Sequence, residues 1–241
     1  MKILITGIHI DDCECGVGGT AAMLAQRGHE VLILNIKPYR RNGARSDEAD
    51  AQSMRAAEVL GAKKIILDYD FSESNFYRNN PRTVRLTENV IRDFKPDILF
   101  MMHPHDNHLE HVECAKTVRE AVFAAAVDGV CPNEIYSYES GQYQTMCYFV
   151  PDFQIKIDSA ADIKRDCTAV FNVTGASGNY LWETCVRCMK FRSGSESLVE
   201  CFKIIKYPKG SNDFFLRTIL KDAFSWTGTN MYFPQTGMMW S

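Results

Sequence analysis

The most constraining feature of the sequence is a stretch near its start, residues 7–18, which reads GIHIDDCECGVG. It follows an apolar run, Ile3–Ile5, that is bounded by Gly7 and predicts a buried strand. One imidazole and three carboxylates then fall within six positions, at His9, Asp11, Asp12 and Glu14. Like charges that are crowded and partly desolvated require a cation or shared protons. We therefore interpret this stretch as half of a metal site.

Composition limits the class of protein and its partners. The chain has 241 residues, of which 46% are hydrophobic and 24% charged, which is typical of a globular protein and compatible with one domain over residues 1–241. A formal net charge of -3 gives no reason to expect nucleic acid or an anionic membrane as a partner. No apolar run approaches the roughly 18 residues of a membrane span.

The cellular compartment is suggested by the cysteines and by the start of the chain. The first predicted strand begins at residue 2, which leaves no room for a secretory signal. Nine cysteines without a framework spacing favour free thiols in a reducing environment. We therefore expect a cytoplasmic protein.

Apolar runs alternate with helical patterns over the first half of the chain. Strands are predicted at residues 2–6, 30–35, 64–67 and 98–102, and helices at 20–27, 46–60, 81–94 and 110–127. This alternation predicts an α/β fold, with a doubly wound, mostly parallel, Rossmann-like sheet and helices on both faces. Such sheets bind ligands at the carboxyl ends of their strands, where His9 and His103 fall.

The second half of the chain is less regular. Strands are expected at 143–150, 153–157 and 199–206, and helices near 160–172 and 179–191. The last thirty residues are rich in aromatic side chains, which we assign to core or subunit-interface packing.

The other half of the metal site is expected in a histidine cluster. Four of the six histidines lie within nine residues, at His103, His105, His108 and His111. His108 and His111 are three positions apart at the start of a predicted helix, so both can face one side. Catalytic zinc usually has three protein ligands and an open position, which His9, Asp12 and one or two of these histidines would supply. The alternative is a polar loop with solvated histidines, but two clusters at the same edge of the sheet favour a metal.

The two clusters resemble the signature of the PIG-L/LmbE-like N-acetylglucosaminyl deacetylases. The first motif is His9-x-Asp11-Asp12-x-Glu14, followed by Gly18-Gly19-Thr20, and the second is His103-Pro-x-Asp106-x-His108-x-x-His111. Weaker marks of the family recur in order, at Arg45-x-x-Glu48-Ala49, Pro96-Asp97, Pro151-Asp-Phe and Glu200-Cys-Phe202. The resemblance covers residue 2 to about residue 205.

This resemblance implies a zinc-dependent hydrolase that removes the acetyl group of an N-acetylglucosamine-type sugar or its conjugate. The metal, Zn²⁺ or alternatively Fe²⁺, would be bound by His9, Asp12 and His111. Asp11 would act as the general base, and His108 would polarise the amide oxygen. Asp106 would orient a histidine. Homotrimers or hexamers would suit the family.

Contacts with the substrate are harder to assign. We expect them from Arg45, Asp70 and Glu14. Glu110 stands where the family commonly has aspartate, and the loop that contacts sugar hydroxyls is matched only loosely by Asp68-Tyr-Asp70. These departures leave the sugar and its aglycone open.

Two other functions are compatible with parts of the sequence. Residues 16–21 fit the G-x-G-x-x-A dinucleotide fingerprint, which would indicate a nucleotide-cofactor-binding oxidoreductase. However, eight residues with three acids separate this stretch from Gly7, and they would repel a pyrophosphate. We instead expect these glycines to let a helix pack closely beneath the site. The remaining alternative is a metal-binding relative that has lost catalysis.

Overall fold

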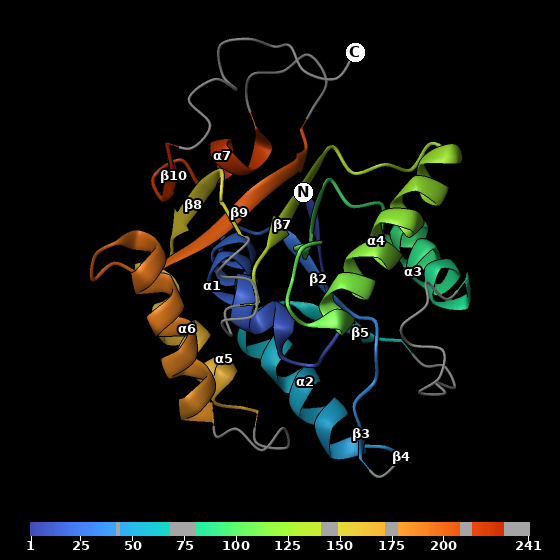
Figure 1. The fold of residues 1–241 in the computed structure, drawn as a ribbon, viewed down its shortest axis with the longest axis horizontal. Coiled ribbons are helices and arrows are strands. Elements are labelled where there is room, and N and C mark those ends of the chain that lie inside the picture. The colour runs from blue at the N-terminus through green and yellow to red at the C-terminus, as the bar shows by residue number, and fades with distance from the viewer. Residues whose placement is uncertain (42–43, 68–80, 141–148, 172–177, 208–213, 229–241) are drawn as a thin grey trace.

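A computed structural model describes residues 1–41, 44–67, 81–140, 149–171, 178–207 and 214–228 (Figure 1). Its central sheet has eight strands in the order β10-β8-β9-β7-β6-β1-β2-β5. Five neighbouring strands run parallel, namely β5 (Lys63–Ile66), β2 (Glu30–Asn35), β1 (Lys2–Gly7), β6 (Ile98–Met102) and β7 (Glu134–Tyr138). Antiparallel pairing adds β9 (Val199–Lys206), β8 (Phe153–Lys156) and β10 (Phe224–Trp226). The predicted α/β fold with a less regular C-terminal part is confirmed.

Helices cover both faces of this sheet (Figure 1). One face carries four helices, α1 (Asp12–Gln26), α2 (Asp47–Val59), α5 (Ala161–Thr168) and α6 (Gly178–Ser193), and α5 contacts each of the other three. On the other face α3 (Pro81–Phe94) packs against α4 (Leu109–Val127). Smaller elements are the hairpin of β3 (Arg40–Arg41) and β4 (Ala44–Arg45), the 3-10 turn Asp158–Ala160 and the short α7 (Phe215–Ile219). Among the helices that the structure describes, none combines the length and the apolar character needed to cross a membrane.

The strand order explains why the loops after β1 and β6 meet. From β1 the chain passes through α1 to β2 and β5 on one side, and it then returns to place β6 on the other side of β1. Strand β1 is therefore the point at which the strand order reverses, and in such sheets ligands bind at the carboxyl end of this point. Apart from the first residue of β1, both strands are buried along their length, as expected for a parallel sheet with two covered faces.

Helix α1 begins at Asp12, earlier than the predicted start at Thr20. Asp12 and Glu14 in its first turn place negative charge at the positive end of the helix dipole, which favours this start. Gly16 and Gly19 are required by packing, because a Cβ at Gly16 would lie 2.3 Å from the ring of Tyr138 and one at Gly19 would lie 2.6 Å from Ile157. This confirms that the glycines allow a close approach of the helix.

Strand β7 is absent from the sequence prediction. Glu134 and Ser137 interrupt its apolar pattern, yet all five of its residues are buried. The carboxylate of Glu134 accepts the hydroxyl of Tyr136 at 2.7 Å and the backbone N–H groups of Phe215 and Leu216. These hydrogen bonds compensate for the burial of the charge.

Some predicted features are tested only in part. Of the strand expected at 143–150, residues 143–148 lie outside the described residues, and residues 149–150 are not in a strand. Tyr232, Phe233 and Trp240 of the aromatic tail also lie outside the described ranges. The predicted strands at 153–157 and 199–206 and the helix at 179–191 are present as β8, β9 and α6. All cysteines of the described ranges are free thiols.

Candidate metal centre

Three side chains converge at the carboxyl edge of the sheet: His9 from the loop after β1, Asp12 from the start of α1, and His111 from the first turn of α4. Nδ1 of His9 lies 3.3 Å from Oδ2 of Asp12 and 3.3 Å from Nε2 of His111. Nε2 of His111 lies 3.3 Å from Oδ1 of Asp12. Two ligands of a tetrahedral zinc, each about 2.0–2.1 Å from the ion, are separated by about 3.3 Å. The nearest atoms of each pair have this spacing, although the two histidines face different oxygens of Asp12. One ligand atom from each residue lies within 4.8 Å of the other two, so the three residues could hold one ion.

The second nitrogen of each histidine contacts a carboxylate. Nδ1 of His111 lies 2.8 Å from Oδ2 of Asp106, whose Oδ1 accepts the backbone N–H of His108 at 2.8 Å. Nε2 of His9 contacts Oε2 of Glu110. Contacts of this kind fix the tautomer and the ring orientation of a metal-binding histidine. Both rings therefore have the remaining nitrogen directed at the site.

Side chains from three further elements hold the loop that carries His9. The backbone carbonyl of His9 accepts a hydrogen bond from Asn35 at the end of β2. The carbonyl of Ile10 accepts from Ser53 of α2 at 3.1 Å and from the ammonium of Lys64 of β5 at 3.0 Å. These three residues lie outside the two sequence motifs and were not predicted, although a polar residue at the end of an apolar strand, as at Asn35, is a signal that points to such a role.

The charge of the site favours a bound cation. Burial opposes protonation of both rings, but the charge of Asp12, together with Glu110, raises the pKa of His9 to about 10. Burial likewise opposes protonation of His111, but the charges of Asp12 and Asp106 raise its pKa to about 9. Without an ion, protons on the two rings balance the surrounding carboxylates, and a divalent ion would replace them. The two imidazoles and the carboxylate therefore fit zinc or a similar divalent metal.

Asp11 directly precedes Asp12 and takes the N-cap position of α1. Only 7% of Asp11 is exposed, and its burial, with the charge of Asp12 beside it, raises the pKa of its carboxyl group. A carboxylate with a raised pKa is a better proton acceptor near neutral pH. This position and this pKa suit a general base.

His108 caps α4 and lies beside the rings of His9 and His111. Its ring is stacked on that of His111 with centroids 4.5 Å apart, and the centroid of His9 is 5.1 Å away. Burial and the two neighbouring rings lower the pKa of His108, which favours its neutral form. Nδ1 accepts the backbone N–H of Glu110 at 3.2 Å, so the neutral ring carries its proton on Nε2. His108 is thus a hydrogen-bond donor at the site.

A second possible set of metal donors overlaps the first and consists of His9, His108 and Glu110. In this set, Glu110 is already paired with the ammonium of Lys37 at 2.5 Å. A cation there would compete with this lysine, so the first set is the better site for a metal.

Of the three residues predicted to bind substrate, only Arg45 is partly exposed in the described structure. Its Nε donates to Asp50 of α2 at 2.5 Å, and its side chain is 28% exposed. Asp70 lies outside the described residues. The contact between Arg45 and substrate remains a prediction.

The placement of Glu14 corrects the third of these predictions. Its side chain has no exposed surface and forms an ion pair of 2.6 Å with Lys64, whose side chain is equally buried. Residues two positions apart point to nearly opposite sides of a helix. Because α1 already begins at Asp12, Glu14 faces the protein interior and not the metal site.

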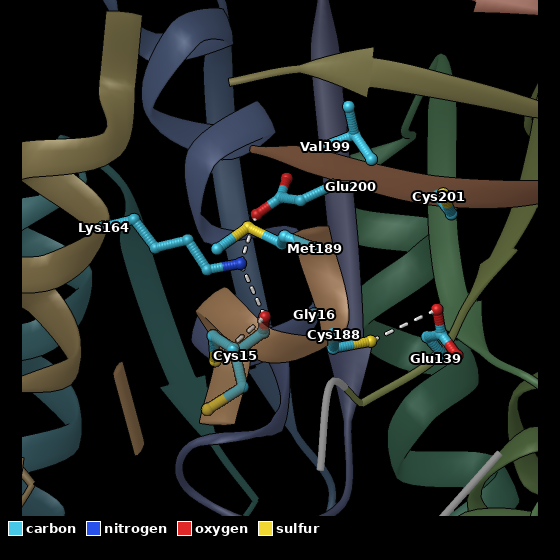
Figure 2. A pocket seen from close by; sticks show the side chains of 10 residues that line it. Cys15, Gly16, Glu139, Lys164, Cys188, Met189, Val199, Glu200 and Cys201 are labelled. Carbon is cyan, nitrogen blue, oxygen red and sulfur yellow. Dashed lines mark hydrogen bonds and ion pairs between the residues drawn. The ribbon is translucent and has the colours of Figure 1, made fainter. Parts of the chain in front are cut away.

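A pocket is lined by residues of α1, α5, α6 and β9 (Figure 2). There the buried Lys164 pairs with Glu200 at 2.5 Å and donates to the carbonyl of Cys15 at 2.6 Å. Glu200 also accepts the backbone N–H groups of Gly19 and Thr20, each at 2.8 Å. A carboxylate thus occupies N–H groups that a dinucleotide fingerprint would offer to phosphate, which argues against the oxidoreductase interpretation. In the described part of the chain, no three metal donors converge at this pocket.

The chain is similar in sequence to a family model and to a known protein that are both named as deacetylases. Residues 4–122 match the family model PIG-L, described as GlcNAc-PI de-N-acetylase. A diacetylchitobiose deacetylase of Thermococcus kodakarensis is 27% identical over 185 residues, which cover 68% of this chain and 66% of that protein. The alignment thus spans a little less than two thirds of the length of that relative.

Solved structures share the fold at low sequence identity. GalB, a 4-carboxy-2-hydroxymuconate hydratase of Pseudomonas putida, is similar with a TM-score of 0.70 and 20% identity, over 88% of this chain and 99% of that one. An N,N'-diacetylchitobiose deacetylase of Pyrococcus horikoshii is similar with a TM-score of 0.60 and 20% identity, over 85% and 83% of the two chains. A hydratase and a deacetylase both have this fold, so the fold alone does not select the reaction.

Proposed function

The chain belongs to the PIG-L family, whose model it matches over residues 4–122, and on this premise we propose that it is a metal-dependent deacetylase. Its substrate would be the acetamide of an N-acetylglucosamine-type sugar or its conjugate. Both sequence matches, the family model and the archaeal relative, are named as deacetylases, whereas the hydratase is similar in fold only. The sequence matches therefore favour amide hydrolysis.

The observation that carries this proposal is the spacing of the donor atoms of His9, Asp12 and His111, each about 3.3 Å from the nearest atom of the next. These three residues would hold Zn²⁺, with Fe²⁺ as the alternative. A bound ion would supply Lewis acidity to the carbonyl group and lower the pKa of a water molecule.

The residues of the chain would divide the remaining work. The Asp11 carboxylate would accept a proton from the attacking water and deliver it to the nitrogen of the leaving amine. Nε2 of His108 would donate a hydrogen bond to the amide oxygen as negative charge develops on it. Asp106 would act through His111, which it holds in orientation. Arg45 would contact polar groups of the substrate beyond the acetamide.

The proposal extends to the location, the domain organisation and the partners of the enzyme. The free thiols of the described cysteines support a cytoplasmic location. We further propose that the chain forms one domain and that its partner is a small N-acetylated amino sugar or glycoside. A homo-oligomer, trimeric or hexameric, is an extension of the family resemblance.

The test is amine release from a panel of N-acetylated amino sugars by the metal-loaded protein and by its Asp11→Asn variant. We expect hydrolysis of at least one sugar, a loss of about 10²–10⁴-fold in kcat for Asp11→Asn, and retention of the metal by that variant. Wild-type rates in Asp11→Asn would refute the proposed base. Binding of a dinucleotide that is insensitive to chelator, with no amine release, would support the oxidoreductase instead.

A further inference from the structure

The two histidines of the metal centre are held by carboxylates, but the carboxylates themselves are held in different ways. Asp106, which contacts His111, is fixed by a backbone N–H, and its side chain is 1% exposed. Glu110, which contacts His9, is 15% exposed, and its Oε1 is bound by the ammonium of Lys37 at 2.5 Å. A lysine side chain thus holds Glu110, whereas a backbone N–H holds Asp106.

The position of Lys37 is itself defined by the loop that carries His9. Lys37 follows β2, and its backbone N–H donates to the carbonyl of Ile8 at 3.2 Å. Its side chain is 23% exposed and reaches across to the first turn of α4. Lys37, in the segment after β2, therefore links the segment that follows β1 to the segment that follows β6.

The consequence for His9 follows from the freedom of a glutamate side chain. Ordering such a side chain costs rotamer entropy. With Lys37 bound to one oxygen, the other oxygen of Glu110 remains directed at Nε2 of His9, and Nδ1 of His9 remains directed at the ion site. Without Lys37, Glu110 would keep its contact with His9 but lose the second restraint on its carboxylate, and more of its rotamers would be accessible.

We propose that Lys37 is a positioning residue that acts through Glu110 on His9 and thereby increases the affinity of the centre for its metal ion. This inference rests on the metal centre of the proposed function, but it does not depend on which amide is hydrolysed. Loss of a residue that orients a metal ligand typically lowers metal affinity 10–100-fold.

The experiment measures the Kd for Zn²⁺ by competition with a chromogenic chelator, in the absence of substrate. We expect Lys37→Met to raise the Kd about 10-fold, and Lys37→Arg, which keeps the charge, to recover most of this loss. Lys63→Met is the matched control, because Lys63 pairs with Glu30 at the exposed edge of the sheet. We expect the Kd of this variant for Zn²⁺ to equal that of the wild type. Lys37→Gln replaces Lys37→Met if that variant does not fold.

A double-mutant cycle separates action through Glu110 from other roles. We expect the Kd of Lys37→Met/Glu110→Gln to equal that of Glu110→Gln alone, because Lys37 then has no carboxylate to hold. Losses that multiply in the double variant, or an unchanged Kd in Lys37→Met, would overturn the inference. An altered KM with an unchanged Kd for Zn²⁺ would assign Lys37 to substrate binding and also overturn it. A wild type that binds Zn²⁺ but hydrolyses no amide would refute the proposed function and leave this inference standing.

Discussion

Nδ1 of His111 lies 2.8 Å from a carboxylate oxygen of Asp106, and this contact leaves Nε2 of the same ring 3.3 Å from Asp12. The side chain of Asp106 is only 1% exposed. Its effect on the reaction is therefore expected to pass through the metal ligand.

Asp106→Asn tests this effect. The amide oxygen of the asparagine can still accept the backbone N–H of His108. However, the negative charge that favours a proton on Nδ1 of His111, and so leaves Nε2 free to bind a metal, is lost. We expect the affinity for Zn²⁺ to fall 10–100-fold, measured by chelator competition. Asp162→Asn, at an exposed site of α5, is the control and should leave the affinity unchanged. Unchanged affinity for Zn²⁺ in both variants would show that Asp106 does not contribute to metal binding through His111.

Metal binding should release protons. The pKa values of about 10 for His9 and about 9 for His111 mean that both rings are protonated at pH 7 in the metal-free protein, and both must be neutral to bind a metal. We expect release of about two protons per ion, and an affinity that rises with pH, less steeply above about pH 9 where His111 is neutral, until His9 loses its proton at about pH 10. Calorimetry at pH 7 in buffers of different ionisation enthalpy gives this number. Release of less than one proton would indicate histidines with ordinary pKa values.

His108 has two roles that substitutions can separate. Its Nδ1 caps α4, and its Nε2–H is the proposed donor to the amide oxygen. His108→Ala should lower kcat 10²–10³-fold and also destabilise the protein by about 1 kcal/mol. His108→Asn keeps a capping oxygen, so we expect a similar loss of kcat with a smaller loss of stability. Equal thermal stability of the two variants would show that the cap is unimportant.

The glycines of α1 offer a matched pair of substitutions. A Cβ at Gly16 would lie 2.3 Å from the ring of Tyr138, whereas the nearest atom to a Cβ at Gly18 is 3.5 Å away. Replacing a helical glycine by alanine gains about 1 kcal/mol where space allows. We expect Gly18→Ala to maintain or raise the free energy of unfolding and Gly16→Ala to lower it, by urea denaturation. Tolerance of both would show that close packing does not require Gly16.

The sequence was sufficient for the α/β fold and for the convergence of His9, Asp12 and His111, because parallel strands bring their carboxyl ends to one edge. It was insufficient for contacts that depend on the register between distant elements, such as the pair of Lys37 and Glu110, which are 73 residues apart. Glu14 was assigned to the substrate because it shares a motif with the metal-binding residues. Because α1 begins at Asp12, the side chain of Glu14 points instead into the core, where it pairs with Lys64.

The central claim is that His9, Asp12 and His111 bind one catalytic metal ion, and the most direct test is the metal content of the purified protein, measured by mass spectrometry beside its amidase activity. We predict one ion per chain in the wild type and loss of both the ion and the hydrolysis in His111→Ala. A wild type without stoichiometric metal, or hydrolysis that persists in His111→Ala, would contradict the account.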